Sequence, residues 1–194
     1  MLCRRCRNPI LDGINLYTYV GNDPLDKTDA TGQTIEYTAD APQDFKDNFG
    51  AAIKDLNAAG AAKGFASMQK SSDKFFVGPA ADRGNGFQTQ YSSTTKTVTW
   101  ADKSGLTVTD SKTGKPATMS PEMSLGHEGQ HAQNDLNGSF KKDNATPDTK
   151  FDTAEERNVI QNYENKAAAK LGEPIRQDHS ASGTVPCSNP KCKK

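Results

Sequence analysis

The sequence predicts an α+β domain, and the order of its hydrophobic patterns leads to this prediction. Apolar residues recur at helical spacing over residues 45–56, and they alternate with polar residues over 97–109. Helical spacing then returns in two segments, at about 120–136 and about 153–171. Helices that flank a block of strands are typical of the α+β class.

A strand and a helix are predicted first. Ile35 and Tyr37 alternate with polar neighbours, which predicts a strand. A helix follows, with Pro42 near its start and Gly60 just past its end. The apolar face of this helix consists of Phe45, Phe49, Ile53 and Leu56.

The middle of the chain predicts strands. Residues 75–77 form a short apolar run typical of a buried strand. Residues 97–101 and 106–109 alternate between apolar and polar side chains, and a turn-like segment, 102–105, joins them. These two segments therefore predict a β-hairpin.

The composition is polar, and it excludes several classes of protein. Hydrophobic residues make up 33% of the 194 residues and aromatic residues 7%, which predicts one domain with a small core. Lys+Arg and Asp+Glu each total 24, so the net charge of zero favours neither a nucleic-acid nor a membrane partner. No apolar run approaches the ~20 residues that cross a bilayer. The charged N-terminus lacks a hydrophobic segment, so we expect no signal peptide.

The helix predicted at about 120–136 has clear end signals. Ser120 is suited to cap it, Pro121 to its first position and Gly138 to its C-terminal end. Its residues divide into two stripes along the helix. The polar stripe consists of Ser124, His127, Glu128, His131 and Asp135, and the apolar stripe of Leu125, Ala132 and Leu136.

The polar stripe contains an H-E-x-x-H motif, at residues 127–131. Residues i and i+4 lie one helical turn apart, so His127 and His131 can both reach one Zn²⁺ at ~2.0–2.1 Å. Glu128 projects beside them and can accept a proton from a water whose pKa zinc lowers to roughly 7. Gly129 stands where an apolar residue is commoner, and it would permit close approach of another segment.

A catalytic zinc needs a third protein ligand, and two neighbouring glutamates are the candidates. On a helix from about 153, Glu156 lies on the apolar face and Glu155 on the wetter face. An inward carboxylate needs a partner, so we expect Glu156 to be the ligand. Glu155 is the second choice, or else a support for one of the histidines. The alternative is a capping box over 153–156, in which the carboxylate serves the helix end.

Two further polar residues follow the end of that helix. Arg176 and His179 are spaced so that they could converge on a developing oxyanion, and Tyr163 is a third candidate for this role. His179 could instead be the third metal ligand. A purely structural alternative pairs Arg176 with a carboxylate and leaves His179 in solvent.

The four cysteines form two close pairs at opposite ends of the chain. They are Cys3 with Cys6 and Cys187 with Cys192. All four could hold one structural zinc if the termini met in space. A local disulfide at one end, or free thiols, are the alternatives.

The N-terminal segment RNPILDGINLYTYVGNDPLDKTDATGQ, residues 7–33, follows the pattern G-x-N-L-Y-x-Y-V-x-N-x-P. It resembles the closing segment of the Rhs/YD-repeat core, a large β-shell that precedes a variable C-terminal toxin. The family's D-P-x-G-L motif of self-cleavage corresponds here to residues 29–33. The resemblance implies an Rhs end over 1–33, cleavage near Gln33 and a toxin domain over 34–180. We expect residues 181–194 to be a flexible tail.

The segments HEGQHAQNDLNG, EERNVIQNYEN and LGEPIRQDH together resemble the NleD-like zinc-metallopeptidase effectors. This resemblance implies a zincin-like fold, with a small antiparallel sheet packed on the H-E-x-x-H helix, and zinc-dependent hydrolysis of peptide bonds. The similar layout of clostridial neurotoxin light chains favours Glu156 as the ligand and Arg176 as transition-state support. His179 stands where the family pattern has tyrosine.

The sequence thus predicts a zinc-dependent endopeptidase toxin that hydrolyses a protein of the target cell. We expect a bacterial secretion system to deliver it as part of a larger Rhs protein. Its expected partners are the substrate protein, a neutralising immunity protein and the Rhs shell before release. One alternative is a non-catalytic, zinc-stabilised interaction module, whose metal site would be closed. Another is a zinc amidase that acts on peptidoglycan.

Overall fold

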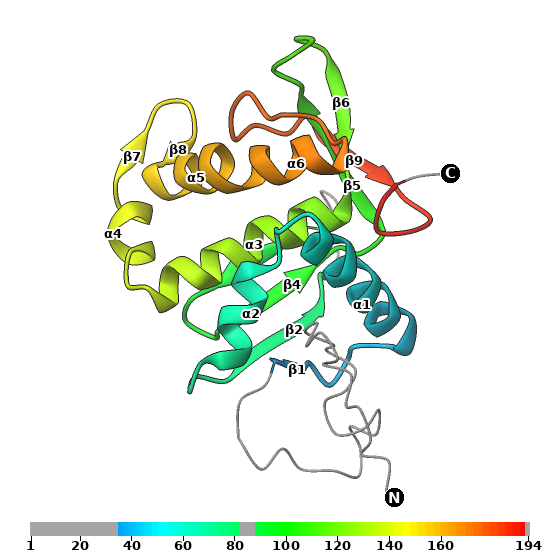
Figure 1. The fold of residues 1–194 in the computed structure, drawn as a ribbon, viewed down its shortest axis with the longest axis vertical. Helices are drawn as coiled ribbons and strands as arrows, with labels where there is room; N and C mark the ends of the chain where they lie inside the picture. The colour runs from blue at the N-terminus through cyan, green and yellow to red at the C-terminus, as the bar shows by residue number, and fades with distance from the viewer. Residues whose placement is uncertain (1–34, 82–87, 193–194) are drawn as a thin grey trace, which may run out of the picture. The chain divides into compact units, whose positions relative to one another are not determined.

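A computed structural model describes residues 35–81 and 88–192 (Figure 1). These residues form a mixed α+β arrangement, so the predicted fold class is confirmed. The first half contains β1 (Ile35–Tyr37), α1 (Gln43–Ala58), α2 (Lys63–Lys70), β2 (Phe75–Pro79), β3 (Gln90–Ser92), β4 (Thr97–Trp100), β5 (Ser104–Thr109) and β6 (Pro116–Met119). The second half contains α3 (Pro121–Leu136), α4 (Phe140–Asn144), β7 (Pro147–Asp148), β8 (Asp152–Thr153), α5 (Ala154–Val159), a π-helical turn (Ile160–Glu164), α6 (Asn165–Leu171) and β9 (Gly183–Pro186).

The sequence predictions for residues 1–34 lie outside the described residues. They include the Rhs-like segment, the cleavage near Gln33, and the state of Cys3 and Cys6. Among the residues that the structure does describe, no helix has the length and hydrophobicity that a membrane span needs.

The larger sheet has four strands in the order β1-β2-β4-β3. Strands β1, β2 and β4 run parallel, and only the edge strand β3 runs antiparallel to its neighbour β4. The sheet on the H-E-x-x-H helix is therefore mixed, and the predicted antiparallel pairing holds for β3 with β4, which both contact α3. Helices α1 and α2 form the connection between β1 and β2, and a helical crossover of this length joins strands in parallel.

The predicted hairpin over 97–109 is wrong. β4 and β5 are consecutive strands, but they belong to different sheets. Both edges of β4 are already paired, with β2 on one side and β3 on the other. β5 instead pairs with β6 and β9 in a three-stranded antiparallel sheet. Alternating polarity predicted each strand correctly, but it does not specify the partner.

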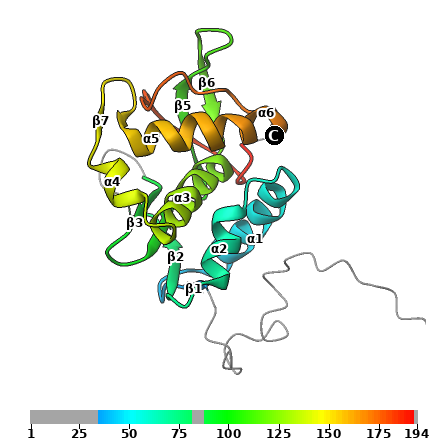
Figure 2. The same ribbon diagram turned by 60° about the vertical axis from the view of Figure 1, so that its left-hand side comes forward.

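Helix α1 buries the four apolar residues that predicted it: Phe45, Phe49, Ile53 and Leu56. Phe45 and Phe49 pack against the larger sheet, where the fully buried Trp100 contacts both rings edge-on, and Leu56 lies against α3 at Gly126. Helix α3 lies between this sheet and the continuous helix from α5 to α6, as both ribbon views show (Figures 1 and 2). The H-E-x-x-H motif therefore lies on α3, the central helix of the domain.

The start of α3 has the predicted cap. The Ser120 hydroxyl accepts a hydrogen bond from the Met123 amide at 3.3 Å, and Pro121 occupies the first helical turn. Gly138 lies just beyond the C-cap with a φ of 79°, a left-handed conformation that suits glycine.

The glycine inside the H-E-x-x-H motif serves helix packing. A methyl group on Gly129 would lie 2.5 Å from the Phe65 ring of α2, and one on Gly64 would overlap the Gly129 carbonyl. The two helices therefore approach through paired glycines. The predicted close approach at Gly129 is confirmed, and α2 is the segment that approaches.

The C-terminal segment is part of the fold. β9 pairs with β5 over four residues, so the prediction of a flexible tail from residue 181 is wrong for the described residues. Cys187 and Cys192 form a disulfide, which confirms the local-disulfide alternative for this pair and excludes a zinc held by four thiolates. The loop that the disulfide closes also touches α3, because the Glu122 amide donates to the Pro190 carbonyl at 3.0 Å.

Candidate metal centre

The two histidines of the motif are buried on α3, and each is held by a carboxylate. His127 Nδ1 donates to Glu164 Oε2 at 2.7 Å, and His131 Nδ1 donates to Glu155 Oε1 at 2.9 Å. Because an ionised carboxylate only accepts, both Nδ1 atoms carry hydrogen. The two Nε2 atoms then face each other at 2.9 Å. With Nδ1–H donated to a carboxylate, each ring presents Nε2 as the atom that can bind a metal, as is typical of metal-ligating histidines.

Glu156 brings a carboxylate to the same point. Its Oε2 lies 3.0 Å from His127 Nε2, and its Oε1 lies 3.3 Å from His131 Nε2. Ligand atoms of the three residues all lie within 4.8 Å of one another, so the group could hold a metal ion. Ligands placed tetrahedrally ~2.1 Å from one ion are about 3.4 Å apart. The distances between these donors are close to that value.

Helix α5 positions Glu156 through its cap. The Thr153 hydroxyl accepts a hydrogen bond from the Glu156 amide at 3.2 Å, which begins the helix at this point. The Glu156 side chain turns away from the cap and toward the histidines. The capping and ligand alternatives therefore apply to different groups, since the hydroxyl caps while the carboxylate lies at the site.

Glu155 lies on the inner side of the same helix, and its prediction on the wetter face is wrong. Its side chain is fully buried between α5 and α3. It accepts hydrogen bonds from His131 Nδ1 and, at 2.8 Å, from Asn134 Nδ2. A carboxylate can be buried there because two donors on α3 meet it. Glu155 therefore supports His131, which is one of the two roles that the sequence predicts for it.

Glu164 reaches the site because the helix widens. Eight residues of α-helix would turn Glu164 about 80° away from Glu156. The π-helical turn over 160–164 adds residues to the turn and reduces that angle, so both carboxylates face His127. Glu164 is fully buried, and its charge is balanced by the Arg176 guanidinium at 3.3 Å.

Glu128 lies beside the ligands without joining them. Its Oε2 accepts a hydrogen bond from the Tyr91 amide of the edge strand β3 at 2.7 Å. This bond fixes the carboxylate between α3 and β3. Burial raises the pKa of Glu128 above its ordinary value, which moves the group toward the range of a general base.

His179 is brought to the site, and Arg176 lies behind it. His179 Nε2 is 3.3 Å from Glu156 Oε2, although His179 is not in the three-residue ligand group. Arg176 binds Glu164 and donates to the His179 backbone carbonyl. The Arg176 guanidinium therefore lies on the Nδ1 side of His127. It pairs there with the Glu164 carboxylate, in agreement with the structural alternative for Arg176.

Tyr163 points away from the ligands. Its hydroxyl donates to the Ala61 carbonyl in the connection between α1 and α2. Burial also raises the pKa of Tyr163 above its ordinary value. The expectation that Tyr163 contacts the oxyanion is therefore not met, because its donor is committed to a backbone acceptor.

The electrostatics of the metal-free site favour protonated histidines. Burial lowers the pKa of each ring, but contacts with Glu156 and Glu164 outweigh it and raise the pKa of His127 to about 10. Glu155 and Glu156 likewise raise the pKa of His131 to about 9. Although burial opposes it, both histidines lower the pKa of Glu156 well below its usual range. A cation at this point would replace a proton and meet the same carboxylates.

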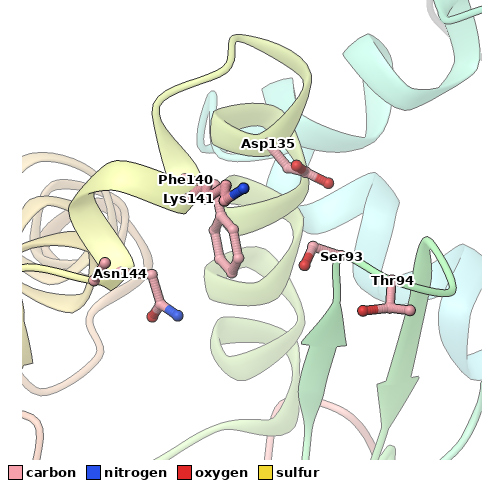
Figure 3. Close-up of a pocket in the computed structure, with 7 residues that line it drawn as sticks. Ser93, Thr94, Asp135, Phe140, Lys141 and Asn144 are labelled. Carbon is pink, nitrogen blue, oxygen red and sulfur yellow. The ribbon is translucent and has the colours of Figure 1, made fainter.

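A cavity of about 370 Å³ lies one helical turn from His131 (Figure 3). Figure 3 shows Ser93 and Thr94 on its strand side and Asn144 on its α4 side. Phe140, which also lines the cavity, has its ring edge-on to the His131 ring at 5.8 Å. The cavity therefore adjoins the metal centre through one aromatic contact.

Sequence reasoning did not identify three contributors to the site. Glu164 lies in the segment EERNVIQNYEN, but no signal in the sequence predicts the π turn that brings it to His127. The Tyr91 amide acts through backbone, which carries no sequence signal. Asp152, which accepts from His179 Nδ1 at 2.6 Å, lies on a strand of two residues that no periodicity reveals.

Comparison with known proteins gives no assignment. No family model, no curated protein and no solved structure matches this chain. The α+β class and the ligand geometry therefore rest on the residues of this chain.

Proposed function

We propose that residues 35–192 contain a zinc-dependent endopeptidase of zincin-like fold. The observation that carries the proposal is the convergence of His127, His131 and Glu156 on one point. Two imidazoles and one carboxylate are a ligand set of catalytic zinc sites, whereas structural sites are closed by four protein ligands. With three ligands among the described residues, a fourth position remains for water or substrate.

Access to the site also supports catalysis. The side chains of Glu156 and His179 are 17% and 33% exposed, while those of His127 and His131 are 5% exposed. Solvent therefore reaches the ligand group from the side of Glu156.

The residues around the ligands have separate tasks in the proposed reaction. Zinc bound there would supply a Lewis acid and a water of lowered pKa. Glu128 accepts a proton from the attacking water and passes it to the leaving amine. Glu164 and Glu155 hold the histidines with Nε2 toward the ligand point. Arg176 anchors Glu164 and the backbone of His179, so its task is positioning.

The test of the proposal compares wild type with Glu128→Gln. Both zinc-supplemented chains are incubated with a random peptide library and, separately, with cell-wall fragments, and products are identified by mass spectrometry. We expect wild type to cleave peptides and Glu128→Gln to lose about 10²–10⁴-fold in rate while it keeps its zinc. Peptide cleavage at the wild-type rate by zinc-loaded Glu128→Gln would contradict the mechanism. Cleavage of cell-wall fragments alone would replace the endopeptidase with an amidase.

We further propose that this enzyme is the toxin of an Rhs-type protein, delivered into a target cell and neutralised by an immunity protein in its producer. The support is the Rhs-like segment 7–33 that precedes the domain. Expression of the chain inside bacterial cells tests the proposal, with Glu128→Gln as the matched control. Growth arrest by wild type and normal growth with the variant are expected, and equal growth contradicts a bacterial target.

A further inference from the structure

Three hydrogen bonds hold His179 in place. Its Nδ1 donates to Asp152 Oδ2 at 2.6 Å, a short, charge-assisted hydrogen bond. Its backbone N–H donates to the Lys150 carbonyl at 3.4 Å, and its own carbonyl accepts from Arg176. The ring is nearly parallel to that of His127, with an interplanar angle of 15°. These contacts fix both the place and the plane of the imidazole.

Asp152 adopts an unusual backbone conformation in this arrangement. Its φ is 67°, in the left-handed region that aspartate tolerates better than most residues. The turn before it is fixed by Asp148 Oδ1, which accepts from the amides of Lys150 and Phe151. Thr153, directly after it, caps α5 and so links the same turn to the metal ligand Glu156. Asp152 therefore belongs to the segment that leads into α5, the helix that carries Glu156.

We propose that Asp152 is a positioning residue that holds His179 with Nε2 turned toward the ligand group. Because Nδ1–H is committed to Asp152, Nε2 is the ring atom that faces Glu156, at 3.3 Å. The ring is thereby directed at the point where His127, His131 and Glu156 converge. A ring nitrogen so placed is suited to hydrogen-bond a substrate oxygen that gains negative charge.

This role rests on the proposed peptidase function, and its test separates the two. Asp152→Asn keeps a neutral acceptor and tolerates the left-handed backbone, whereas Asp152→Gly removes the acceptor without strain. Asp178→Asn is the matched control, since it changes a carboxylate that is adjacent to His179 in sequence and accepts a hydrogen bond from the Ser180 amide. The first measurement is the His179 Nδ1–H resonance of the full zinc-supplemented chain by NMR. The second is kcat and KM for peptide cleavage.

The proposal expects the Nδ1–H resonance in wild type and the control, a weakened signal in Asp152→Asn and none in Asp152→Gly. It expects kcat to fall on the order of tenfold in Asp152→Gly, less in Asp152→Asn, with KM changed less than about twofold. An unchanged resonance in Asp152→Gly overturns the contact, and an unchanged kcat overturns its catalytic role. If wild type cleaves no peptide, the peptidase proposal fails, and the resonance still decides whether Asp152 positions the ring.

Discussion

The Nε2 atoms of His127 and His131 face each other at 2.9 Å, and each ring is held there from behind by a buried carboxylate. Two imidazole nitrogens at this distance need a proton or a cation between them, because two lone pairs repel. The arrangement is anchored from three elements, since α3 carries the rings, α5 carries Glu155 and the π turn carries Glu164. Contacts within the protein therefore set the positions of both rings.

Replacement of Glu164 tests the support behind His127. Glu164→Gln keeps a carbonyl acceptor but removes the charge that Arg176 balances. We expect zinc affinity to fall about 10–100-fold, as measured by competition with a chromophoric chelator. Glu36→Gln, a half-exposed carboxylate on β1, is the control and should leave the affinity unchanged. An unaltered affinity in Glu164→Gln would show that the buried pair is dispensable for metal binding.

Tyr163 distinguishes a packing role from a catalytic one. Tyr163→Phe removes the donor to the Ala61 carbonyl, so the free energy of unfolding should fall by about 1 kcal/mol. The kcat for peptide cleavage should stay within about twofold, because the hydroxyl does not face the ligands. Urea unfolding and steady-state kinetics on the same preparation give both values. A large loss of kcat with unchanged stability would restore the oxyanion role.

Gly129 tests the contact between α2 and α3. A methyl group there would meet the Phe65 ring at 2.5 Å, so Gly129→Ala should lower the free energy of unfolding by about 1–3 kcal/mol. Gln133→Ala, on the same helix, should change it by less than about 0.5 kcal/mol. Phe65→Leu combined with Gly129→Ala should cost less than the sum of the two single changes. Additive costs would place the strain elsewhere.

The stability of the metal-free chain should depend on pH through the two histidines. Their pKa values are raised to about 10 and about 9, so their contribution is complete below the unfolded value of 6.5 and is lost as the pH rises through 9 and 10. In the presence of chelator, the free energy of unfolding should therefore fall from about pH 7 to about pH 10. Urea unfolding at several pH values measures this slope. The double variant His127→Gln, His131→Gln should reduce it, and an equal slope in that variant would exclude these groups as its source.

Features set by local pattern were predictable from the sequence. The helical spacing of Phe45 to Leu56 and the cap at Ser120 depend on neighbouring residues, and both are present in the structure. The ligand atoms of His127 and His131 converge because a helix places i and i+4 on one face. The argument that an inward carboxylate needs a partner does not select Glu156, because Glu155 is the more deeply buried of the two.

Features that depend on distant segments were not predictable in this way. β5 pairs with β9, more than seventy residues later, and no local pattern indicates that partner. The π turn changes the face on which Glu164 lies, so a helical wheel drawn at the α-helical period fails beyond residue 160. Glu155 is buried because Asn134 and His131 meet it, which is a property of α3 and not of α5.

The most direct measurement is zinc per chain by elemental analysis, for wild type, His127→Ala and Glu128→Gln, each purified without chelator and supplemented with zinc. Wild type and Glu128→Gln should each hold about one zinc, and His127→Ala should hold none, because only the first two retain all three ligands. Zinc retained in His127→Ala, or absent from wild type, would contradict the assignment of His127, His131 and Glu156 as a metal centre.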